Sequence, residues 1–237
     1  MSETLLMVGV RSLGRAIALH FAHQGWTVLC AALTKESVEA LAAEVTQNGG
    51  RGIPVVCDLR EPDSLRGLST HGRIDLCIAA QTAGGRFGPR PLLETDDAEL
   101  ERGFASYVRG TWNLLKAVGP QLVAQQSGTF LQIGTSSGVR TKEGFAPLGT
   151  VQHALRALVQ VAAREWRSQG VHVAYLPIDG GIESERSADW VARTGADRAI
   201  PQNEIVRACE YLYRQDRRAW THELLLRPPG NEWLAGT

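Results

Sequence analysis

Residues 5–22 read LLMVGVRSLGRAIALHFA, and this stretch decides the fold. Its first four residues are apolar and predict a short buried strand, whereas residues 15–22 have the pattern of a helix. Gly9 and Gly14 lie in the turn between them. A strand, a glycine turn and a helix in this order present backbone N–H groups and the positive end of a helix dipole to a phosphate. The stretch therefore predicts a phosphate-binding turn.

The turn matches the dinucleotide fingerprint GxGxxG only in part. Gly9 and Gly14 keep the first and last glycines, but Arg11 occupies the middle position, and such a match is weak by itself. The following residues strengthen it, because residues 27–32 predict a second apolar strand and residues 35–45 an amphipathic helix. This βαβα series indicates an α/β fold.

The same alternation continues to the end of the chain. Further strands are predicted at residues 52–57, 74–80, 129–134, 171–176 and 223–226, and further helices at residues 62–68, 97–125, 146–169 and 201–215. Near-continuous apolar strands separated by helices predict a parallel sheet with helices on both faces. No repeat or linker divides the sequence, so we expect residues 1–237 to form a single-domain, doubly wound α/β fold of the Rossmann type.

Composition excludes several classes of function. The 237 residues are 43% hydrophobic with a formal net charge of +0, so the chain can bury a large core and is not biased toward nucleic acid or membrane partners. No leader-like segment precedes the first strand and no apolar run could span a bilayer, so a cytoplasmic location is expected. The four cysteines show no CxxC spacing, which predicts buried free thiols and no metal site.

Over nearly the whole chain these residues resemble the short-chain dehydrogenase/reductase family. Residues 9–18 resemble its glycine-rich turn, one residue shorter than the usual TGxxxGxG, and Asp58 resembles the aspartate that contacts the adenine. Residues 128–133 and 153–165 resemble the strand and helix of the active site, and residues 171–182 resemble the segment lining the nicotinamide pocket in a divergent subgroup. The resemblance implies a dinucleotide site formed by Gly9, Arg11, Ser12, Leu13, Gly14, Leu33, Thr34, Asp58, Leu59, Ala79, Ala80, Pro177, Gly180 and Ile182.

The end of the second predicted strand bears on which cofactor is bound. A site that prefers NAD places Asp or Glu there to bind the ribose 2′-hydroxyl, but residues 31–35 read AALTK. Arg11 resembles the basic residue of family members that select the 2′-phosphate. The sequence thus favours NADP(H) over NAD(H). The alternative is that Arg11 is a solvated loop residue and the shortened turn binds no dinucleotide.

The catalytic positions implied by the resemblance are all altered. In the family, a lysine four residues after a tyrosine lowers the pKa of that tyrosine for proton exchange; here Leu148 and Gln152 occupy the two positions. Leucine cannot exchange a proton, and glutamine can donate hydrogen bonds but carries no charge. The family serine corresponds to Thr135, and the helix asparagine falls near Tyr107. Thr135, Gln152 and Tyr107 are therefore the remaining candidates for catalysis.

Each candidate also has a structural interpretation. Tyr107 fits a half-buried aromatic residue on a long helix, His153 a subunit contact or surface histidine, and the Ser136-Ser137 pair a turn that caps a strand. Ser184-Glu185 and residues 94–97 fit helix N-terminal caps. Three classes stay open: an oxidoreductase on a small carbonyl or alcohol, with water or Thr135 handling the proton; a dinucleotide-binding sensor or inactive partner subunit; and a structural descendant.

The sequence says less about quaternary structure and substrate than about the fold. Helices like those predicted at residues 97–125 and 146–169 pair across two-fold axes in the resembled family, so we expect a homodimer or homotetramer. Residues 182–200 are expected to form a loop that covers the pocket, and they are polar. They indicate no substrate class.

Overall fold

The computed structural model describes residues 2–85 and 87–230. Its central sheet is parallel and has six strands in the order β3-β2-β1-β4-β5-β6. The strands are β1 (Thr4–Val8), β2 (Thr27–Ala32), β3 (Arg51–Val56), β4 (Leu76–Ala79), β5 (Thr129–Thr135) and β6 (His172–Ile178). The strand order reverses between β1 and β4, which creates the crevice where such sheets bind ligands. The predicted fold class is confirmed.

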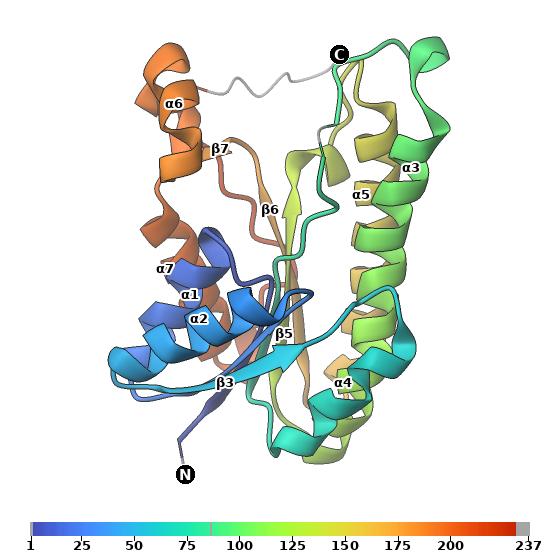
Figure 1. The fold of residues 1–237 in the computed structure, drawn as a ribbon. Coiled ribbons are helices and arrows are strands. Elements are labelled where there is room, and N and C mark those ends of the chain that lie inside the picture. Colours follow the sequence, from blue (N-terminus) through green and yellow to red (C-terminus); the bar gives the residue numbers. More distant parts are fainter. Residues whose placement is uncertain (1, 86, 231–237) are drawn as a thin grey trace.

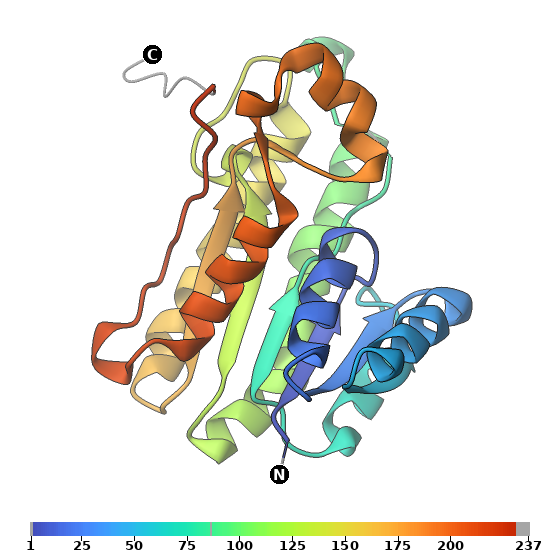
Figure 2. The same ribbon diagram turned by 90° about the vertical axis from the view of Figure 1, so that its left-hand side faces the viewer.

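Helices cover both faces of the sheet (Figure 1). One layer comprises α1 (Leu13–Ala22), α2 (Lys35–Gln47) and α7 (Gln202–Arg214), and the other comprises α3 (Asp97–Gly103), α4 (Gly110–Gln125) and α5 (Ala146–Arg167). Figure 2 views the sheet through the first layer, with α1 and α7 in front of the strands. The two layers of helices thus enclose the sheet.

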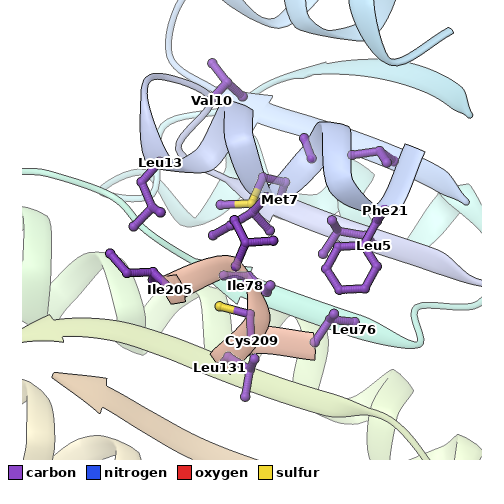
Figure 3. Packing of buried hydrophobic residues seen from close by; sticks show 14 of the residues in the cluster. Leu5, Met7, Val10, Leu13, Phe21, Leu76, Ile78, Leu131, Ile205 and Cys209 are labelled. Atoms are coloured by element: carbon purple, nitrogen blue, oxygen red, sulfur yellow. The ribbon is translucent and has the colours of Figure 1, made fainter. Parts of the chain in front are cut away.

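Alternation along the strands produces two separate cores. Leu5 and Met7 of β1 pack under α1 and α7, where Phe21 and Cys209 join them (Figure 3). Leu6 lies on the opposite face, in the core beneath α4 and α5. Because successive strand side chains point to opposite faces, one short apolar strand contributes to both layers. All four cysteines are buried and unpaired, as predicted.

Two predicted helices have a different form. The helix predicted at residues 97–125 is interrupted between α3 and α4 by the π-helical segment Phe104–Arg109. The helix predicted at residues 62–68 is a 3₁₀ segment, Pro62–His71. Apolar periodicity indicates helices but does not resolve these variants. A π-helical turn holds an extra residue and often lies at functional sites; here it carries Tyr107.

The carboxyl-terminal part also departs from expectation. Residues 223–226 were predicted as a strand; they extend the sheet beyond β6 only through two isolated parallel bridges, Tyr175 with Glu223 and Ile178 with Leu226. The polar residues 182–200, predicted as a loop, contain α6 (Ala188–Thr194) and β8 (Ala199–Ile200), which pairs with β7 (Gly181–Ile182). These two short strands pair with each other, and residues far apart in the sequence form that pairing. The sequence of either strand alone therefore gives little indication of it.

The predicted caps are confirmed. The Asp96 carboxylate accepts the Ala98 N–H at 2.8 Å at the start of α3, and the Ser184 hydroxyl accepts the Ser187 N–H ahead of α6. In the part of the chain that the structure describes, no helix has the length and hydropathy needed to cross a membrane.

Candidate functional site

A cavity of about 970 Å³ lies at the carboxyl-terminal ends of the strands. This is the position at which doubly wound sheets bind ligands. The structure brings together at its wall the predicted residues Gly9, Arg11, Ser12, Leu13, Gly14, Leu33, Thr34, Asp58, Leu59, Ala80, Tyr107, Thr135, Gln152, Gly180 and Ile182. Ala79 and Pro177 were also predicted to bind the cofactor, but they are buried within β4 and β6 and do not line the cavity. Successive side chains of a strand point to opposite faces of the sheet, and these two are buried against the layers that cover it.

The glycine turn has the close backbone approach that a phosphate site requires. Gly9 has φ +91°, and a Cβ there would lie 2.7 Å from the Ala80 carbonyl oxygen; a Cβ on Gly14 would overlap the Gly9 carbonyl. The turn therefore tolerates no side chain at either position, and it places the amino-terminal end of α1 against the cavity. These features fit the pyrophosphate of a dinucleotide.

Ser12 adopts a backbone conformation that normally belongs to glycine. Its φ is 43° and its ψ is −104°, a combination that costs an L-residue about 1–3 kcal/mol. Its hydroxyl accepts a hydrogen bond from Gln202 Nε2 at 2.8 Å. The shortened turn thus keeps a glycine-like shape without glycine at this position.

We expect Ser12→Gly to stabilise the protein by about 1 kcal/mol, because relief of this strain should exceed the extra unfolded-state entropy of glycine. Denaturant unfolding would measure the change. Ser168→Gly is the matched control, since Ser168 has an ordinary φ of −66° and should lose stability. Equal losses in both variants would contradict the strain at Ser12.

Among the described residues of β2 and the segment that follows it, none that lines the cavity is acidic. Leu33 and Thr34 follow the strand and line the cavity, and Leu33 is largely exposed. Arg11 is exposed beside the turn and makes no ion pair within the described residues. Arg11 supplies a guanidinium at this part of the cavity wall, and it could pair with a 2′-phosphate.

Asp58 lines the cavity, and its carboxylate forms an ion pair with Arg60. The Arg60 guanidinium donates three hydrogen bonds to it, at 2.6, 2.9 and 3.1 Å, and these bonds are the largest cause of the lowered pKa of Asp58. The sequence did not reveal this pair. Asp58 therefore remains ionised at neutral pH and places a negative charge, paired with Arg60, at the cavity wall.

At the opposite end of the cavity, Gln152 is held in one orientation. The side chain is buried, and its Oε1 accepts hydrogen bonds from the Thr135 N–H at 3.3 Å and the Tyr175 hydroxyl at 3.4 Å. Because both neighbours donate to the oxygen, the amide nitrogen is the group left to donate into the cavity. The Thr135 hydroxyl accepts the Ser137 N–H at 3.2 Å and keeps its own proton available.

Tyr107 reaches the cavity, whereas Leu148 does not. Burial raises the pKa of the Tyr107 phenol, against an opposing hydrogen bond with the Ala83 backbone. The phenol therefore stays protonated at neutral pH and can donate a hydrogen bond to a substrate oxygen. His153 is exposed, does not line the cavity and has Nδ1 2.9 Å from the Gly149 carbonyl oxygen, in agreement with its interpretation as a surface residue.

A buried ion cluster beneath this end was not predicted. The Asp179 carboxylate accepts bonds from Arg140 at 2.9 and 3.0 Å and from Arg227 at 2.6 Å. Burial alone would raise the pKa of Asp179, but hydrogen bonds from Ser136, Arg140 and Arg227 outweigh it and lower the pKa. The only sequence signal is an acidic residue that directly follows an apolar strand.

Comparison with known proteins assigns the chain to a family. The family model described as enoyl-(acyl carrier protein) reductase matches residues 8–226. A metagenomic short-chain oxidoreductase, solved in complex with NADP, superposes with a TM-score of 0.78 at 25% identity over 95% of this chain and 96% of its own. The chain belongs to the short-chain dehydrogenase/reductase family of oxidoreductases, as the sequence resemblance indicated.

Two sequence relatives are described only in general terms. An uncharacterised oxidoreductase of Mycobacterium tuberculosis is 33% identical over 162 residues, which are 65% of this chain and 60% of the relative. Oxidoreductase UcpA of Escherichia coli K12 is 28% identical over 72% of this chain and 66% of its own length. The match thus spans less than two thirds of either relative.

Proposed function

We propose that this protein is an NADP(H)-dependent oxidoreductase that acts on a small carbonyl or alcohol with a non-standard proton-transfer site. The observation that carries the proposal is one continuous cavity, which joins the glycine turn and Arg11 to Thr135 and Gln152. A similar protein solved with NADP supports a nicotinamide dinucleotide as the cofactor, and the choice of NADP(H) over NAD(H) rests on Arg11. When bound, the nicotinamide would donate or accept a hydride.

The residues of this chain then have separate roles. The Gln152 amide would donate a hydrogen bond to a ribose hydroxyl, as the family lysine does, but without lending a positive charge. The Thr135 hydroxyl would bind the carbonyl oxygen. Tyr107, whose phenol is kept protonated by burial, or a water molecule would supply the proton. Purified protein should therefore oxidise NADPH slowly when it is given an activated carbonyl such as an α-diketone.

Arg11→Ala should weaken NADPH binding about tenfold or more and leave NADH binding nearly unchanged, because a guanidinium–phosphate pair at a partly exposed site contributes roughly 1–3 kcal/mol. Calorimetric titration measures both affinities. Arg15→Ala is the control, since Arg15 pairs with Glu44 and does not line the cavity. Equal losses for both cofactors would mean that Arg11 only supports the turn.

We also propose that the protein is a homodimer or homotetramer that associates through α4 and α5. Phe104, Trp112 and Val161, which belong to these helices and the π-helical turn before α4, are large exposed apolar residues. Burial of such residues in a symmetric contact is favourable. Sedimentation at micromolar concentration should show a dimer or tetramer, and a monomer alone would contradict the proposal.

A further inference from the structure

The end of the cavity next to Thr135 has an excess of positive charge. Among the described residues that line the cavity, only Asp58 and Asp179 are acidic, and Asp58 lies at the cofactor end. Asp179 is matched by Arg140 and Arg227, which do not line the cavity themselves. Among the described residues of the cavity wall, no acidic side chain is therefore left at this end to balance a further cation.

Two further cations line the cavity at this end, Lys142 and Arg198. Neither forms an ion pair with any residue in 2–85 or 87–230. Two other cations line the cavity away from this end. Arg60 pairs with Asp58, and Arg11 lies beside the glycine turn. Lys142 and Arg198 are thus available to a ligand that approaches Thr135.

The two cations come from separate segments of the fold. Lys142 lies between β5 and α5, and Arg198 directly precedes β8, which pairs with β7 beside Gly180. In Figure 1, α6 stands on one side of the open end and the start of α5 on the other. The Arg198 N–H donates to the Gly195 carbonyl at 3.2 Å, which closes the 3₁₀ turn Ala196–Arg198.

An apolar surface lies beside the cations. The Trp190 ring lines the cavity and packs so closely on Gly181 that a Cβ there would overlap it. Ile182 adds an aliphatic contact. A ligand that fits this end therefore combines an anionic group with a small apolar body.

Resting on the function proposed above, we infer that the substrate is a carbonyl compound or alcohol that also carries an oxyanion, a carboxylate or a phosphate, which Lys142 and Arg198 bind. The two cations act as specificity determinants and leave the reacting oxygen to Thr135. Arginine and lysine bind both kinds of oxyanion, so the experiment separates them.

The test compares charged probes with neutral analogues on protein saturated with NADP⁺. Acetoacetate is paired with methyl acetoacetate, and dihydroxyacetone phosphate with dihydroxyacetone; binding is followed by calorimetry. We expect the anion of at least one pair to bind tenfold or more tightly than its neutral partner. The pair that shows this preference identifies the oxyanion as carboxylate or phosphate.

Lys142→Met and Arg198→Met should each reduce this preference about three- to tenfold, and the double variant should abolish it, with NADPH affinity unchanged throughout. Arg193→Met, on α6 but outside the cavity wall, is the matched control and should retain the preference. Equal binding of anion and neutral partner in both pairs would overturn the inference. A loss of NADPH affinity in the two single variants would also overturn it, because the cations would then serve the cofactor.

The same probes distinguish failure of the oxyanion site from failure of the proposed function. If the wild-type protein binds no NADPH, the same probes are titrated into the protein alone. A preference for the anion that depends on Lys142 and Arg198 would then support the oxyanion site without the cofactor. Its absence would overturn the oxyanion site as well.

Discussion

Leu148→Tyr combined with Gln152→Lys should raise the reductase rate toward a quinone or an α-diketone by about 10²–10⁴, the usual contribution of a positioned general acid. Both positions lie on α5, four residues apart, so their side chains project from one helix face. Gln152 already lines the cavity. A tyrosine at position 148 extends further than the leucine that it replaces and should reach toward the same space.

Each single change should do little, because the new tyrosine needs the charge of the lysine to lower its pKa. Gln152→Lys also removes the acceptor for the Thr135 N–H and the Tyr175 hydroxyl, which should cost about 1–3 kcal/mol of stability. NADPH oxidation is therefore measured on variants shown to be folded by circular dichroism. A folded double variant that binds NADPH without any gain in rate would replace the enzyme interpretation with that of an inactive binder.

Asp179→Ala should destabilise the protein by about 3 kcal/mol, since it leaves two largely buried guanidinium groups without their shared carboxylate. Only 2% of the Asp179 side chain is exposed, whereas Arg140 and Arg227 are 17% and 19% exposed. Their bonds connect the segment after β5, the end of β6 and the segment after residue 226. Asp179→Asn should have a smaller effect of the same sign, which denaturant unfolding can measure.

The stability difference between wild type and Asp179→Asn should depend on pH. The pKa of Asp179 is lowered in the folded protein, so its contribution is complete above the unfolded pKa of about 3.9 and declines as pH falls below that value. Asp216→Asn is the control, because its pair with Arg218 is exposed, and it should leave stability nearly unchanged. A stability difference that stays constant from pH 7 to pH 3 would show that the Asp179 charge does not stabilise the fold.

The strands and helices were predictable where the pattern is local. Residues 5–8 are all apolar, so their burial follows from their own sequence. The glycines at positions 9 and 14 likewise indicate the turn without reference to the rest of the chain. The π-helical turn at Tyr107 has no such signal, because one extra residue per turn hardly alters apolar periodicity. Residues 182–200 form β8 and α6 through contacts that their own sequence does not indicate.

The candidate site shows the same division. Thr135 and Gln152 could be placed by counting along a strand and a helix, and both line the cavity. The Asp179 cluster could not, because Arg140 and Arg227 are 39 and 48 residues away along the chain. Lys142 and Arg198 look like ordinary charged loop residues until the fold places them on one cavity.

Calorimetric titration of NADPH, and then of NADH, into the purified wild-type protein tests the proposed function most directly. The glycine turn, the cavity and Arg11 lead us to expect NADPH to bind about tenfold or more tightly than NADH, a difference of at least about 1.4 kcal/mol. Binding of neither cofactor would show that the shortened turn around Ser12 no longer holds a dinucleotide, and would contradict the proposed function.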